Sequence, residues 1–142
     1  MHDAPACLQA ETHEAYQDVQ PLCDKYVSQA SALFQTYVDL KYAARWRELD
    51  ARAIERPGGR ADAAAFGAAG WAVIVGQAPS SKEKQVVLPM AIEQAMDSAM
   101  LSDLFAQLPS DAVHTHVLLA MMSNDATVVY YRLSQGMVKP IN

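Results

Sequence analysis

Residues 113–142 read VHTHVLLAMMSNDATVVYYRLSQGMVKPIN, and this stretch decides which fold the sequence predicts. Two apolar runs rich in β-branched residues, 117–122 and 127–133, are separated by Ser-Asn-Asp-Ala. Strand-length runs joined by turn-forming residues indicate a β-hairpin, and the short run at 137–139 indicates a last strand. The first run is apolar nearly throughout, which is typical of a strand covered on both faces. We therefore expect the hairpin to lie at the centre of a sheet and to contact a partner.

The residues upstream predict a long helix followed by three strands. Apolar residues from Leu22 to Leu40 recur at spacings of three and four, which predicts one continuous helix over residues 18–43. Pro89 is expected to end the third strand, because proline cannot donate to a sheet ladder. The strands are predicted at residues 45–54, 71–76 and 85–88.

A second amphipathic helix is predicted between the third strand and the hairpin. Its apolar positions run from Met96 to Leu108, and Asp97 or Ser98 is the expected N-cap. The whole order predicts an α+β fold, in which two helices flank a mixed, mostly antiparallel central sheet.

Composition and charge limit the possible domain organisation and the possible class of partner. The chain has 142 residues, of which 51% are hydrophobic, and a formal net charge of −5. We expect a flexible N-terminal segment at residues 1–17, which shows no clear period, and a single domain at residues 18–142. An acidic domain is a poor surface for neutralising nucleic-acid phosphates directly.

The N-terminal residues and the cysteines indicate the cellular compartment of the protein. Residues 1–17 lack a basic region and an apolar core, so no signal peptide is expected, and no apolar stretch approaches the roughly 18–20 residues that would insert in a membrane. Cys7 and Cys23 are interpreted as two reduced thiols, with one disulfide as the alternative.

The sequence lacks the common catalytic and cofactor motifs. It contains no G-x-S-x-G elbow, no His-Glu-x-x-His pair and no Cys-x-x-Cys pair. The glycine-rich residues 58–70 have neither the Lys-Ser/Thr ending nor the GxGxxG spacing of phosphate-binding loops. This segment is therefore interpreted as a connector or a short helix, and no cofactor is expected.

His114, His116 and Asp125 are the candidate functional residues. Residues two apart on a strand share a face, so the two imidazoles could jointly hold a metal ion or act as acid and base. The alternative is a pair of half-exposed histidines at the mouth of a central strand, which the absence of a nearby third ligand favours. Asp125 is either a turn former or a charge that enters a polar pocket of another subunit.

Residues 124–140, NDATVVYYRLSQGMVKP, resemble the C-terminus of the small non-catalytic subunit of the eukaryotic tRNA-splicing endonuclease. The family's pattern there is a short Asp-containing turn, an apolar pair, Tyr-Tyr, a basic residue, Leu, two polar residues, Gly and a closing Pro. Pro89 with the apolar residues after it, and YVDL at 37–40 followed by Trp46, are similar to further segments of the family. The resemblance covers about residues 20–142 and implies a nuclease-like α/β fold used for assembly.

The resemblance also implies that the catalytic triad is incomplete. Catalytic members of the family use a Tyr, a His and a Lys as base, acid and positive stabiliser. The lysine position corresponds to His116, which carries no permanent charge at neutral pH, and residues 85–88 contain no histidine where the catalytic members place theirs. A structural subunit that is not itself an enzyme is therefore expected, with precursor tRNA contacted only indirectly through the complex.

The family's mode of assembly implies the partners and the residues that contact them. Two copies of its fold pair through their C-terminal strands, and an acidic hairpin loop of one subunit enters a polar cleft of another. The implied partners are a homologous catalytic subunit and other subunits of the complex, with a homodimer when the chain is isolated and the nucleus, or else the cytoplasm, as the location. The expected partner-interface residues are Asn124, Asp125, Tyr130, Tyr131, Met137, Val138 and Lys139.

Two other functions stay open on the sequence alone. The chain could be a small ribonuclease of the same fold that acts through His114 or His116. It could also be an unrelated protein-binding module whose hairpin resembles the family by chance.

Overall fold

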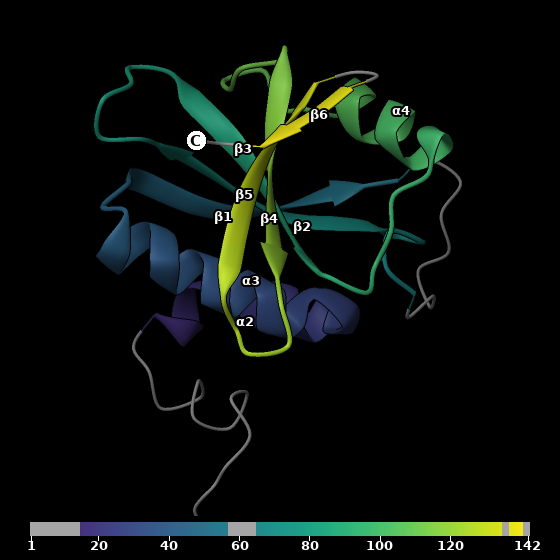
Figure 1. Cartoon of the computed structure of the whole chain (residues 1–142), viewed down its shortest axis with the longest axis horizontal. Helices are drawn as coiled ribbons and strands as arrows, with labels where there is room; N and C mark the ends of the chain where they lie inside the picture. The colour runs from purple at the N-terminus through teal and green to yellow at the C-terminus, as the bar shows by residue number, and fades with distance from the viewer. Residues whose placement is uncertain (1–14, 57–64, 135–136, 141–142) are drawn as a thin grey trace, which may run out of the picture.

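A six-stranded sheet lies between helices in the computed structural model, which describes residues 15–56, 65–134 and 137–140 (Figure 1). Helix α4 (Ser98–Ala106) connects β3 to β4, which are parallel, whereas all other neighbouring strands are antiparallel. The predicted α+β class with a mixed, mostly antiparallel sheet is confirmed. The strands lie across the sheet in chain order: β1 (Arg47–Glu55), β2 (Gly70–Gln77), β3 (Lys84–Ala91), β4 (His116–Met122), β5 (Val128–Ser134) and β6 (Met137–Pro140).

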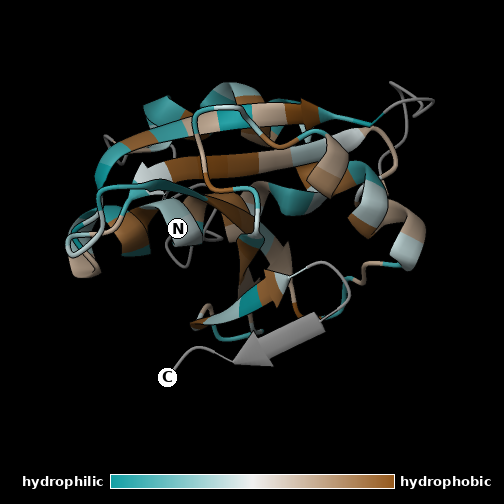
Figure 2. Ribbon diagram, turned by 90° about the horizontal axis from the view of Figure 1, so that it is seen from above, coloured by the Kyte–Doolittle hydropathy of each residue, from teal (hydrophilic) through white to brown (hydrophobic). Residues whose placement is uncertain are grey.

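Each face of the sheet carries its own hydrophobic core. Helices α2 (Tyr16–Lys25) and α3 (Ala30–Val38) pack on one face, and α4 packs on the other. Figure 2 shows the hydrophobic colouring of the strands enclosed between these layers. Because the central strands are covered on both sides, their side chains are buried irrespective of alternation. The fully buried residues of β2 and β3 include Trp71, Val73, Ile74, Val75, Val86, Val87 and Leu88.

The first helical segment is interrupted, so the prediction of one continuous helix is wrong. Tyr26 leaves the helical conformation at φ −113° and ψ 71° after α2, and a 3₁₀ turn, η1 (Val27–Gln29), leads into α3. The last turn, η2 (Asp39–Ala43), is π-helical. We attribute the interruption to a tertiary contact. It places the side chain of Gln29 in the core, with 1% of its surface exposed.

Gln29 satisfies backbone groups between β2 and β3. The paired residues of these strands end at Ile74 and Val87, before Ala72 would meet Pro89, which has no N–H to donate. The Gln29 side chain accepts from Ala72 N and donates to the carbonyl oxygens of Ala72 and Pro89, each at 2.9 Å. β3 consequently continues through Pro89 to Ala91, and the prediction that Pro89 ends the strand is wrong.

Two predictions about the sheet are also corrected. β1 has a bulge between Arg47 and Asp50, where Glu48 adopts φ 53°. Trp46 and Leu49 therefore pack against the same core, although strict alternation along the predicted strand at residues 45–54 would put them on opposite faces. The hairpin of β4 and β5 is not the centre of the sheet, because β3 and β4 are its middle strands and β6 lies outside β5.

The predicted ends of the domain are described only in part. Residues 1–14 of the segment expected to be flexible lie outside the described residues, as do Cys7 and residues 57–64 of the glycine-rich connector. Cys23 is a free thiol, and burial raises its pKa to about 11. None of the helices in the described ranges is long and apolar enough to cross a membrane.

Candidate functional site

Asp125 lies in the turn between β4 and β5, where it is held by its own neighbours. Its Oδ1 accepts from the Ser123 hydroxyl at 2.5 Å and from Thr127 N at 3.2 Å, and Ser123 N donates to Thr127 O at 2.9 Å. The Ser123 bond, followed by those from Thr127, lowers the pKa of Asp125 to about 2. Asp125 is therefore an ionised turn former, exposed at the hairpin tip beside exposed Asn124.

The two tyrosines predicted to meet a partner are half-buried within this chain. The Tyr130 hydroxyl donates to Asp39 Oδ2 at 2.6 Å, and burial together with this bond raises the pKa of Tyr130. Tyr131, on the opposite face, packs against the core that α4 covers. Tyr130 thus ties the hairpin to η2, while Tyr131 supports it from the other side.

The predicted partner strand forms the edge of the sheet. Met137, Val138 and Lys139 belong to β6, whose backbone pairs antiparallel with β5 from Ser134 to Tyr131. Across the described ranges no strand pairs with the outer side of β6. Its outward backbone groups are therefore positioned for strand addition by another chain.

His114 and His116 lie in different structural environments. β4 begins at His116, so His114 is in the preceding loop, and the premise that both share one strand is wrong. His114 Nε2 lies 2.7 Å from Pro109 O, whereas His116 Nε2 lies 3.1 Å from Gln85 Oε1. The described residues contain no group of three or more His, Cys, Asp or Glu side chains that could hold a metal ion.

His116 is held in its neutral form. Burial lowers its pKa, the nearby Arg132 charge lowers it further, and Glu83 opposes them. Gln85, the first of residues 85–88 where the resemblance implies a catalytic histidine, lies beside His116, where it implies a catalytic lysine. They present an amide and a neutral imidazole, an arrangement with a hydrogen bond but no permanent positive charge.

We expect the imidazole of His116 to titrate below the ordinary histidine value of about 6.5 when followed by NMR. Arg132→Gln removes one of the two causes and should move the midpoint upward, whereas Arg47→Gln should leave it unchanged. Because the unfolded chain binds this proton more readily, the stabilising contribution is complete above about pH 6.5 and is lost as the pH falls through the folded-state pKa. A midpoint at or above 6.5 in the unmodified protein contradicts this assignment.

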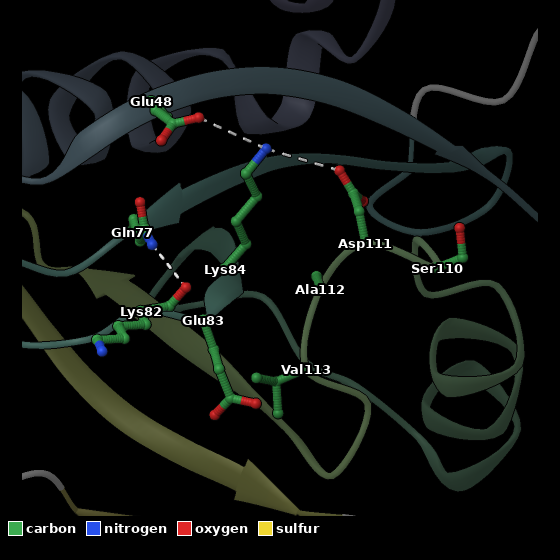
Figure 3. Close-up of a pocket in the computed structure, with 9 residues that line it drawn as sticks. All are labelled: Glu48, Gln77, Lys82, Glu83, Lys84, Ser110, Asp111, Ala112 and Val113. Carbon is green, nitrogen blue, oxygen red and sulfur yellow. Dashed lines mark hydrogen bonds and ion pairs between the residues drawn. The ribbon is translucent and has the colours of Figure 1, made fainter.

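A polar hollow of about 350 Å³, which the sequence did not reveal, is lined by residues of β1 and β2, by the start of β3 and by residues 110–113 (Figure 3). Lys84 Nζ lies between Glu48 and Asp111, at 3.9 and 3.8 Å from their carboxylates. Asp111 also receives two bonds of 3.0 Å from Arg52, which lower its pKa to about 2. Lys84 and Asp111 therefore already have ionic partners within this hollow.

These features indicate the class of protein to which the chain belongs. An α+β sandwich whose edge strand β6 has no outer strand partner among the described residues, and whose hairpin tip is charged and exposed, has two surfaces that can contact other chains. The chain belongs to the Sen15 protein family, whose model matches residues 35–142. The match confirms the resemblance seen at the C-terminus, and it begins within α3.

A curated relative carries the same family name. The tRNA-splicing endonuclease subunit SEN15 of Eremothecium gossypii is 38% identical to this chain over 60 residues. The alignment covers 39% of this chain and 49% of the relative. The chain thus spans about half the length of the curated relative that it matches.

Proposed function

We propose that this chain is a non-catalytic structural subunit of a tRNA-splicing endonuclease. It pairs with a homologous catalytic subunit and supports excision of introns from precursor tRNA, which it meets only through the complex. Membership of the Sen15 family and the name of the curated relative support this function. We further propose that the complex acts in the nucleus.

The edge strand β6 is the observation that carries the pairing. Strand addition along β6 would satisfy backbone groups that have no strand partner among the described residues. The same edge can pair with a second copy when the catalytic subunit is absent, which supports a homodimer of the isolated chain. The hairpin tip, with the ionised Asp125, is available for a second contact, because its carboxylate is exposed although it also forms the turn.

The geometry of His116 and Gln85 supports a role without catalysis. A ribonuclease of this fold would need a base, an acid and a positive stabiliser at the scissile phosphate. The pKa of His116 is lowered, so its imidazole is neutral at pH 7 and cannot supply the permanent charge. Cleavage of an intron-containing precursor tRNA by the purified chain, lost in His116→Ala, would establish the alternative function.

Removal of β6 tests the pairing. Co-expressed with the catalytic subunit of its own endonuclease, the tagged full chain should retain that subunit on an affinity column. A variant that ends after Ser134 should retain at least about tenfold less, because strand pairing supplies the interface. Asp24→Asn, an exposed position on α2 away from β6 and from the hairpin tip, serves as the control and should retain the subunit. Circular dichroism must show that the shortened variant is still folded.

The isolated chain gives an independent reading of the same edge. Sedimentation analysis over a concentration series should show a monomer–dimer equilibrium for the full chain and a monomer for the variant ending after Ser134. A strict monomer of the full chain at high micromolar concentration contradicts strand pairing. Retention of the catalytic subunit by the shortened variant contradicts it as well.

A further inference from the structure

A groove of about 350 Å³ lies between the end of the first helical segment and the start of β5. The helix lines it with residues spaced by three, one, three and one, and the hairpin lines it with residues 126–128. This spacing corresponds to one face of a helix, distinct from the face that buries Leu33, Tyr37 and Leu40 in the core. The helical lining residues are Gln35, Val38, Asp39, Tyr42 and Ala43.

The groove combines apolar walls with a negative charge. Val38 and Val128 are partly buried at its sides, and 44% of the surface of Tyr42 is exposed. Asp39 accepts the Tyr130 hydroxyl at 2.6 Å, which fixes its carboxylate in place. None of the lining residues, all of them within the described ranges, is a lysine, arginine or histidine.

The surroundings add to this negative character. Asp125 precedes the lining residue Ala126, and its lowered pKa keeps it ionised. Lys41, the nearest cation along the helix, lies 3.6 Å from the Asp18 carboxylate and 5.6 Å from the centre of the Tyr42 ring, so it has an ionic partner of its own although it lies near the groove. The carboxylates of Asp39 and Asp125 therefore favour a positively charged group of another molecule at this groove.

We propose that this groove binds an arginine-containing peptide segment of a partner protein. An arginine stem can pack along Val38 and Val128 while its guanidinium meets the Asp39 carboxylate in the planar, paired geometry that lysine lacks. Residues 1–14 of this chain contain no arginine or lysine, so the N-terminal segment does not have the required chemistry. The surface is separate from β6, and the proposal does not depend on the endonuclease function.

Titration of the ¹⁵N-labelled full chain with the peptide acetyl-Gly-Val-Arg-Val-Gly-amide tests this proposal. Chemical-shift changes should be confined to residues 35–43 and 126–128. Asp39→Asn keeps an acceptor for Tyr130 but removes the charge, so it should weaken binding by about fivefold or more. Asp24→Asn, which removes an exposed acid on α2, changes the net charge equally and should alter the affinity less than about twofold.

A blocking variant and a matched peptide complete the test. Ala43→Trp places a bulky ring at the exposed rim and should abolish the shift changes while the rest of the spectrum stays intact. The peptide with glutamate in place of arginine should not bind. Equal binding of both peptides, equal binding by Asp39→Asn, or shifts located elsewhere would overturn the proposal. Concentration-dependent shifts of the same residues without peptide would show that a second copy occupies the groove, which also overturns it.

Discussion

Gln29→Leu is expected to lower the free energy of unfolding by about 3 kcal/mol or more, measured by urea denaturation. The variant keeps an apolar side chain in the core but leaves Ala72 N, Ala72 O and Pro89 O without the partner they have at 2.9 Å. Each buried backbone group left without a hydrogen bond costs about 1–3 kcal/mol. The melting temperature should fall by roughly 10 °C, given the scaling for a domain of this size.

Two further variants separate the hydrogen bonds from the change in side-chain polarity. Gln20→Leu is made on the exposed surface of α2 and should change the stability by less than about 0.5 kcal/mol. Gln29→Glu keeps an acceptor for Ala72 N but has no amide donor for the two carbonyl oxygens, so it should also be strongly destabilised. If Gln29→Leu loses less than about 1 kcal/mol, the assignment of Gln29 as the group that closes the ladder is wrong.

Gly70→Ala is the second substitution with a large expected effect. Gly70 opens β2 at φ +129°, a conformation that residues with a Cβ rarely adopt. A Cβ there would lie 2.1 Å from Ile54 O and 3.0 Å from Glu55 Cα, both of them backbone atoms that no side-chain rotation can move away. Strain and overlap together should cost at least about 3 kcal/mol of the free energy of unfolding.

Gly76→Ala is the matched control in the same strand. A Cβ at Gly76 would lie 2.7 Å from Leu49 Cδ2, which is the end of a side chain that can shift, and Gly76 is not at positive φ. Its cost should be about 1 kcal/mol, well below that of Gly70→Ala. Similar losses for the two variants, measured under the same urea series, would show that the backbone at β1 and β2 yields more readily than this geometry implies.

The strands and the turn were predictable because their signals are local. The runs at 71–76, 117–122 and 127–133 correspond to β2, β4 and β5, and Tyr130 and Tyr131 lie on opposite faces, as alternation along a strand requires. Asp97 was one of two expected caps of α4, and its side chain accepts from Met100 N at 2.8 Å. Capping, turn formation and strand propensity act within a few residues of sequence, so a short window is enough to find them.

The candidate surfaces were predictable to a smaller extent. The C-terminal strand and the Asp125 turn were found from the sequence, and the structure places both at the outside of the fold. The groove beside Tyr42 was not found, because its two walls come from residues 35–43 and 126–128, which are far apart in the chain. The salt bridges of Asp111 were missed for the same reason, since Pro109-Ser110-Asp111 reads only as the end of a helix.

By itself the sequence determined the α+β class, the succession of strands along the chain and the resemblance to the Sen15 family, because these follow from local apolar patterns and from the C-terminal motif. Only the tertiary structure decided that the first helix breaks before Gln29 and that β3 passes through Pro89. Both depend on one event, the insertion of a buried amide between two strands at residues 72 and 89. A proline and a glutamine sixty positions apart carry no joint signal in the chain, and only folding brings their hydrogen-bonding groups together.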